Sequence, residues 1–200
     1  MEKEAPNRAN SSPSLFSIYE NYFDNYHGRK VTIETSYKPL LRFDIIFNET
    51  DLPHLLGLHK LDKDSASKQL DKIKSGELTY QVIKKRDGFH QIKDRIKHID
   101  FINRVFLTRE VRQCICVSKE DSKNSMRLDI VFMEDSIQRV LNLGLRKVSN
   151  QRNVYTPVTF FVSKSKGTAY PYSKRAKIKS LEWDEKVLLM EKAKIQNKNS

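Results

Sequence analysis

The chain has 200 residues, of which 38% are hydrophobic, and it carries a formal net charge of +12. This length and composition fit one globular domain and exclude a collagen-like or wholly disordered chain. No apolar run of about 18 residues occurs, which excludes a membrane-spanning helix, and the polar N-terminal start predicts a cytoplasmic protein.

The excess of basic residues has the clearest functional meaning in the composition. Lys and Arg number 37, against 25 Asp and Glu, and such an excess creates a positive field that attracts polyanions. RNA or DNA is the first expected partner and an anionic membrane surface the weaker one. A basic protein with no special polyanionic partner stays open as an alternative.

The first part of the chain alternates between helical and extended patterns. Residues 1–14 are polar and aperiodic and predict a disordered leader. Apolar residues at helical spacing predict an amphipathic helix over 15–26. Residues 30–36 and 40–48 have the pattern of two strands joined by a turn at a Lys-Pro pair.

The next segment, LPHLLGLHKL, occupies residues 52–61. Thr50 precedes an acidic residue and a proline, which indicates a helix start and places His54 in a first turn. His59 and Lys60 follow among leucines. Two imidazoles and an ammonium group can be ordinary packing, or they can be the acid, base and cation of a reaction centre.

Helical patterns continue from residue 62 to residue 106. Two short helices are predicted over 62–76 and 77–88, each closing on a glycine. The segment 89–106 places most of its apolar residues on one stripe and predicts a single third helix.

The second half of the chain has strand-like runs with short connections. They cover residues 112–120, 126–135, 139–148 and 154–164. Short connections imply antiparallel neighbours, so these runs predict a four-stranded meander. A helical part followed by this sheet is an α+β fold. In the last run, Thr156 is expected on the face toward the helices, and Tyr155 and Thr159 on the opposite face.

A basic segment follows the predicted sheet. Residues 163–180 carry six Lys or Arg and no acidic residue. Lysines neutralise phosphates and tyrosines stack on unpaired bases, so this segment is expected to bind RNA. The residues proposed for this role are Lys164, Lys166, Tyr170, Tyr172, Lys174, Arg175 and Lys177. The alternative is a solvated loop that leads into a helix predicted from residue 181.

Several chemistries find no support in the sequence. On one continuous helix, His54 and His59 would diverge by roughly 140°, so they are not expected to share a metal ion. No G-x-S-x-G elbow and no glycine-rich phosphate loop occurs. Cys114 and Cys116 fit neither a zinc knuckle nor a C-x-x-C redox pair and predict structural thiols. We therefore expect neither a metal nor a cofactor.

Metal-free RNA cleavage needs a base, an acid and a cation beside one phosphate. Histidine is suited to proton transfer near neutral pH. The positive end of a helix disfavours imidazolium, which suits His54 to the role of base. Lys60 and arginines on the sheet could stabilise the phosphorane, and Gly57 would allow close backbone approach in the turn.

The segments RFDIIFNETDLPHLLGLHKL and KIKSGELTYQVIKK, with the basic apolar helix after them, resemble a known family. It is the phage-associated branch of the barnase–EndoU–colicin–RelE-like nucleases, in the group with an H-L-L-G-L-H-type signature. The resemblance covers about residues 15–165 and leaves 166–200 as a basic loop and C-terminal helix. It implies helices packed on a four-stranded antiparallel sheet, and metal-independent RNase activity of a toxin or effector from a phage or mobile element.

Residue by residue, the resemblance supports a small catalytic set. His54, Gly57 and His59 match the signature, and Lys60 follows it. Polar residues on the last strands supply further expected members of the site. The complete expected catalytic set is His54, His59, Lys60, Arg152, Tyr155 and Thr159.

RNA is the expected partner, and an antitoxin or immunity protein is a second candidate. Two other functions stay open: an inactive nuclease-derived RNA-binding or partner-binding module, and an accessory protein that acts on a host protein. Histidines packed inward would favour the first, and an exposed apolar patch in place of a basic cleft would favour the second.

Overall fold

The computed structural model describes residues 13–121, 126–136, 138–164 and 170–184. The helices are α1 (Leu15–Tyr26), α2 (Asp51–Leu56), α3 (Ala66–Lys74), α4 (Tyr80–Lys84), α5 (Lys93–Lys97) and α6 (Phe101–Phe106), with short 3-10 turns η1 (Lys38–Leu40), η2 (Leu58–Lys60) and η3 (Phe89–Gln91). The strands are β1 (Lys30–Thr35), β2 (Arg42–Ile46), β3 (Gln113–Cys116), β4 (Ile130–Asp135), β5 (Val140–Lys147), β6 (Val154–Ser163) and β7 (Lys174–Asp184). In this part of the chain, no helix has the length and apolar character needed to cross a bilayer.

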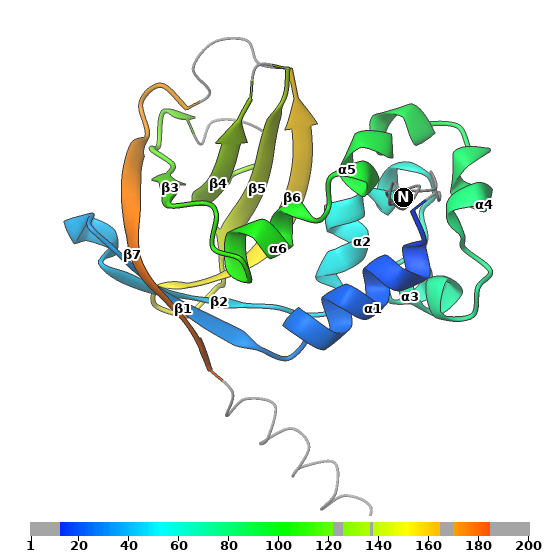
Figure 1. The fold of residues 1–200 in the computed structure, drawn as a ribbon, viewed down its shortest axis with the longest axis horizontal. Helices are drawn as coiled ribbons and strands as arrows, with labels where there is room; N and C mark the ends of the chain where they lie inside the picture. The colour runs from blue at the N-terminus through cyan, green and yellow to red at the C-terminus, as the bar shows by residue number, and fades with distance from the viewer. Residues whose placement is uncertain (1–12, 122–125, 137, 165–169, 185–200) are drawn as a thin grey trace, which may run out of the picture.

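The strands form a closed barrel, and helices α1 to α5 gather beside it (Figure 1). The order around the barrel is β1-β2-β6-β5-β4-β3-β7. Strands β3 to β6 pair as the expected antiparallel meander, and β2 joins β6 in parallel through Asp44 and Ile45. The α+β class is confirmed. The expected sheet of four strands is wrong, because β1, β2 and β7 join the meander and leave no open edge.

Strand β7 replaces the expected loop and the first residues of the expected helix. It pairs antiparallel with both β1 and β3, and Trp183 lies opposite Val31. Hydrogen-bonded ladders on both sides outweigh the local charge pattern that indicated a loop and the apolar spacing that indicated a helix. The rest of that expected helix, residues 185–198, lies outside the described residues.

The segment predicted as one helix over 89–106 is divided into η3, α5 and α6. The break falls at His98, where the backbone leaves helical geometry, and Asp100 is then the N-cap of α6. Its apolar residues serve two surfaces: α5 contacts α2 and β6, whereas Phe106 of α6 packs on Phe132 inside the barrel. One straight helix could not reach both surfaces.

A β-bulge changes the expected faces of β6. Gly144 pairs with Thr159, but the next residue, Leu145, pairs with Pro157, so Val158 is the extra residue. A bulge of this kind reverses which side chains point inward beyond it. Tyr155 therefore joins the barrel core with Phe160, while Thr159 stays on the outer face.

Two apolar clusters hold these layers together. The larger one fills the barrel and the helix interface, where Tyr26, Phe47, Phe106 and Trp183 contact one another through their rings. The smaller one covers the outer face of the meander and centres on Ile115, Leu128 and Val131. The outer cluster supports one wall of the cleft described next.

Candidate functional site

A cleft of about 600 Å³ opens between the helical part and the outer face of β5 and β6. It is lined by His54, His59, Lys60, Arg95, Met126, Leu128, Arg146, Val158 and Thr159. Four of the six expected catalytic residues, His54, His59, Lys60 and Thr159, are thus brought together from segments far apart in the sequence.

The two histidines approach each other because the helix between them ends. Helix α2 stops at Gly57, which has a φ of 78°, and η2 begins immediately after it. The rings of His54 and His59 have centroids 5.8 Å apart and planes inclined by 44°. Both side chains are exposed, so neither is packed inward. The divergence expected for one continuous helix does not occur.

Gly57 also allows the close approach that the sequence indicated. A Cβ atom at this position would lie 3.0 Å from Cδ of Arg95 and 3.0 Å from Cγ2 of Ile92. The positive φ and this crowding both favour glycine. The turn that carries the histidines therefore rests directly on the side chain of Arg95.

The cleft is electropositive. Five of its nine lining residues are basic and none is acidic. Partial burial of the ring and the charges of His54, Arg95 and Lys60 lower the pKa of His59 below its ordinary value of 6.5. Burial and Arg95 also lower the pKa of Lys60. Positive groups thus oppose one another here, and a bound anion would relieve this repulsion.

Two arginines of the cleft were not predicted from the sequence. Arg95 lies on α5 and is only 9% exposed, and Arg146 on β5 donates to the carbonyl oxygen of Met126 at 2.5 Å. A signal for Arg95 existed, because it interrupts the apolar stripe between Ile92 and Ile96. For Arg146 the sequence indicated only that arginines on the sheet could take part.

Gly144 shapes the wall that carries Thr159. A Cβ atom on Gly144 would lie 2.6 Å from Cδ1 of Leu128 and 2.9 Å from Cγ2 of Thr159. The glycine therefore lets these two side chains meet across the outer face of the meander. Together with the bulge at Val158, it places Thr159 in the wall of the cleft that contains the histidines.

The structure places the other expected catalytic residues away from the cleft. Tyr155 is buried in the barrel against Phe43, and burial, Asp129 and Cys116 raise its pKa. Arg152 is exposed and lines a separate hollow in the β5–β6 connection. Thr156, the other threonine considered on this strand, donates to the carboxylate of Asp51 at 3.4 Å and so joins β6 to α2.

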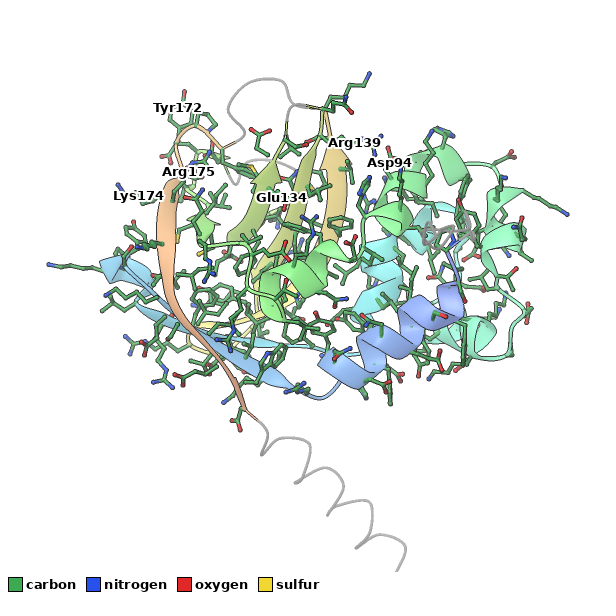
Figure 2. All side chains as sticks on the ribbon, viewed as in Figure 1. Asp94, Glu134, Arg139, Tyr172, Lys174 and Arg175 are labelled. Atoms are coloured by element: carbon green, nitrogen blue, oxygen red, sulfur yellow. The ribbon has the colours of Figure 1, made fainter. Side chains whose placement is uncertain are left out.

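Most of the expected RNA-binding residues lie on or just before β7, away from the histidines in strand order, whereas Lys164 directly follows β6. Tyr172, Lys174 and Arg175 lie at one end of β7, as labelled in Figure 2. Around the closed barrel, β7 lies three strand spacings from β6 through β2 and β1 and four through the meander, which is roughly 14 to 19 Å of sheet. Only an RNA of several nucleotides could contact both places.

The remaining members of that set differ in exposure. Tyr172 is 73% exposed, and Lys164 and Lys177 are also exposed. Tyr170 is partly buried and packs on the outer apolar cluster, which leaves less of its ring to stack on a base. Lys166 lies outside the described residues.

An α+β protein whose cleft combines proton-transfer groups with cations has the equipment to act on a phosphodiester. A comparison with known protein families agrees with this phosphodiester chemistry. Residues 14–199 match the family described as phage-Barnase-EndoU-ColicinE5/D-RelE like nuclease 4. The chain therefore belongs to this nuclease family, which supports a nuclease function and a nucleic-acid substrate.

The family match confirms the expected family and covers more of the chain than the sequence resemblance did. It includes residues 166–199, which the sequence resemblance had left out. The longer match agrees with the structure, in which β7 is one of the strands that form the barrel. No curated protein and no solved structure gives a significant match to the chain.

Proposed function

We propose that this protein is a metal-independent endoribonuclease that cleaves RNA by attack of a ribose 2′-hydroxyl on the adjacent phosphodiester. The observation that carries the proposal is the pair of imidazole rings, 5.8 Å apart, in one basic cleft. At this separation both rings can reach oxygens bound to one phosphorus atom. Family membership supports the nuclease class.

The charges of the cleft favour a division of roles between the histidines. The lowered pKa of His59 keeps its imidazole neutral near physiological pH, which suits a general base. The helix-terminus argument had favoured His54 as the base, and the surroundings of His59 favour the reverse. His59 removes the 2′-hydroxyl proton, and His54 in its protonated form donates to the leaving 5′-oxygen.

The bond changes then balance without a further reactant. The 2′-oxygen forms a bond to phosphorus as the bond from phosphorus to the 5′-oxygen breaks. The products are a 2′,3′-cyclic phosphate and a free 5′-hydroxyl. Lys60 and Arg146 stabilise the charge that develops on the phosphate oxygens, and the Thr159 hydroxyl positions the ribose or the phosphate.

The donor set of the cleft supports chemistry that is independent of a metal. The described residues of its lining supply two imidazoles and no carboxylate, whereas hydrolytic zinc and magnesium sites commonly use three protein ligands or one to two carboxylates. We further propose that the enzyme acts as a toxin or effector of a phage or other mobile element, with an antitoxin or immunity protein as a partner.

Incubation with RNA in excess EDTA tests the proposal. Wild-type protein should leave 2′,3′-cyclic phosphate ends, and H54A and H59A should each lose most of the activity. His90→Ala is a matched control, because His90 is exposed and does not line the cleft. Salt-sensitive RNA binding by all four proteins, without cleavage of cellular RNAs or ribosomes, would instead establish the inactive RNA-binding module.

A further inference from the structure

Arg95 is buried without the partner that a buried guanidinium normally has. It is 9% exposed, and its Nη1 atom has no hydrogen-bond partner among the described residues. A buried charge is costly unless it is paired and hydrogen-bonded. In the free protein, the burial of the Arg95 guanidinium is therefore expected to lower the stability of the fold rather than to raise it.

Two other partly buried arginines of this protein have acidic partners, whereas Arg29 lies over the ring of Trp183. Arg104 forms an ion pair with Glu134, and Arg86 forms one with Asp62. Among the described residues, no carboxylate lines the cleft that contains Arg95. Unlike Arg104 and Arg86, the Arg95 guanidinium thus has no acidic partner among these residues at the place where the cleft opens.

The backbone around Arg95 is shaped to hold it in place. Its Cδ and Nε atoms lie 3.0 and 3.2 Å from the point where a Cβ atom of Gly57 would be. Gly57 separates α2, which carries His54, from η2, which carries His59. The guanidinium is therefore held against the turn that presents both imidazoles.

We propose that Arg95 is the main anion-binding residue of the cleft and holds the non-bridging oxygens of an RNA phosphodiester between His54 and His59. This inference rests on the proposed function for the identity of the anion. A guanidinium suits the task, because its planar fork donates two parallel hydrogen bonds to a phosphate. The bound phosphate supplies the negative charge that the described residues around Arg95 do not provide.

The anion also changes the charge balance of the neighbouring histidine. Arg95 is one of the groups that lower the pKa of His59. A phosphate bound at Arg95 offsets that charge, so the pKa of His59 rises when the site is filled. Arg95 thus favours a neutral base in the free enzyme, and the bound substrate makes it easier for that base to accept a proton.

Thermal unfolding in inorganic phosphate, compared with sodium chloride of equal ionic strength, tests the site without any substrate. Phosphate should raise the unfolding temperature of wild type and should have little effect on R95M. Arg42→Met is the matched control, because it removes the same charge at an exposed site outside the cleft. An equal phosphate response in wild type and R95M would overturn the proposal.

An all-deoxy decamer tests the phosphodiester itself. It lacks the 2′-hydroxyl, so the proposed reaction cannot cleave it and binding is measured separately from activity. By fluorescence anisotropy at fixed salt, R95M should weaken binding about 10- to 100-fold and R42M about twofold or less. Arg95→Lys should fall between wild type and R95M, because it keeps the charge and loses the fork.

The two proposals fail in different ways in this experiment. Decamer binding that depends on Arg95 in a protein that cleaves no RNA would retain the anion site and reject the endoribonuclease. RNA cleavage by a protein whose R95M variant binds the decamer as tightly as R42M would reject the anion site alone.

A measurement on wild-type protein covers the case in which R95M does not fold. In a ¹⁵N spectrum, the Arg95 Nε–H signal, assigned with the Arg95→Lys variant, should shift and saturate as inorganic phosphate is added. The pKa of the His59 ring should rise in the same titration. An Arg95 signal that stays in place up to high phosphate would overturn the proposal.

Discussion

Gly57 determines where the two imidazoles of the cleft lie. A residue with a side chain would resist the φ of 78° and would crowd Arg95. With glycine, α2 ends between the histidines and the chain turns them toward one cleft. In the H-L-L-G-L-H signature, the buried leucines therefore hold the turn in place, and the glycine lets both imidazole rings face the same cleft.

The lowered pKa of His59 has a consequence for the pH profile of cleavage. A base that ionises below 6.5 keeps its activity into mildly acidic solution, so the acid limb of kcat/KM should have its midpoint below that value. Lys60→Met removes a neighbouring positive charge and should move the midpoint upward, besides lowering the rate. Lys63→Met, outside the cleft, is the control. A midpoint at or above 6.5 that Lys60→Met does not move would contradict this account.

Asp51 gives a prediction about stability. Burial raises its pKa to about 6, against an ordinary value of 3.8, although Asn48 and Thr156 donate hydrogen bonds that act in the opposite direction. The folded protein therefore holds this proton more tightly than the unfolded chain. The contribution of Asp51 to stability is full below the ordinary value and is lost as pH rises through about 6, by about 3 kcal/mol in total.

Asp51→Asn isolates that contribution, because asparagine stays neutral at every pH. Urea unfolding of wild type and the variant should show D51N gaining on wild type by about 2 to 3 kcal/mol between about pH 4 and about pH 7.5. A stability difference that is the same at both pH values would show that the Asp51 carboxylate is not held neutral.

Strand β6 is the element that divides the barrel core from the cleft. The bulge at Val158 places Tyr155 inside the barrel and Thr159 outside. Strict alternation along the strand would have placed both on one face. A single extra residue in the ladder thus separates a core side chain from a cleft side chain.

This division predicts opposite effects for two conservative variants. Thr159→Val removes a hydroxyl from the cleft and should lower kcat/KM for RNA cleavage about tenfold or more. Tyr155→Phe removes the hydroxyl of a side chain that is buried in the barrel core and should leave cleavage unchanged. A larger loss with Tyr155→Phe would show that the bulge does not lie at Val158.

At the scale of the whole molecule, β7 closes the barrel and connects the C-terminal part of the chain to its beginning. Trp183 packs with its ring 5.7 Å from that of Phe47 and 5.8 Å from that of Tyr26. The guanidinium of Arg29 lies 4.4 Å from the Trp183 ring. The stability of the fold therefore depends on β7, although the basic residues in the first part of this strand indicate a surface loop.

Trp183→Ala should lower the free energy of unfolding by about 3 kcal/mol, because it leaves a cavity among aromatic rings at the barrel closure. Tyr172→Ala, which removes an aromatic ring that is 73% exposed, should change it by about 0.5 kcal/mol or less. Chemical denaturation measures both. Equal effects of the two substitutions would mean that β7 does not close the barrel in solution.

Local signals in the sequence predicted the first helix, the strands at 30–35 and 42–46, the meander and the histidine turn. Each depends on neighbours within a few residues, or on a periodicity that survives in the fold. The continuous helix over 89–106 was wrong, because its apolar stripe packs on two surfaces that only the assembled fold contains. The four-stranded sheet was wrong, because closure depends on partners far away in the chain.

The sequence by itself determined the α+β class, the nuclease family and the segment that carries both histidines, because these follow from spacing and residue type along a short stretch. Only the tertiary structure decided that Arg95 and Arg146 join the cleft while Arg152 and Tyr155 do not. The physical reason is that a cleft is made by the approach of distant segments. A bulge in β6, a broken helix and a closing strand govern that approach, and none of them has a local pattern of its own.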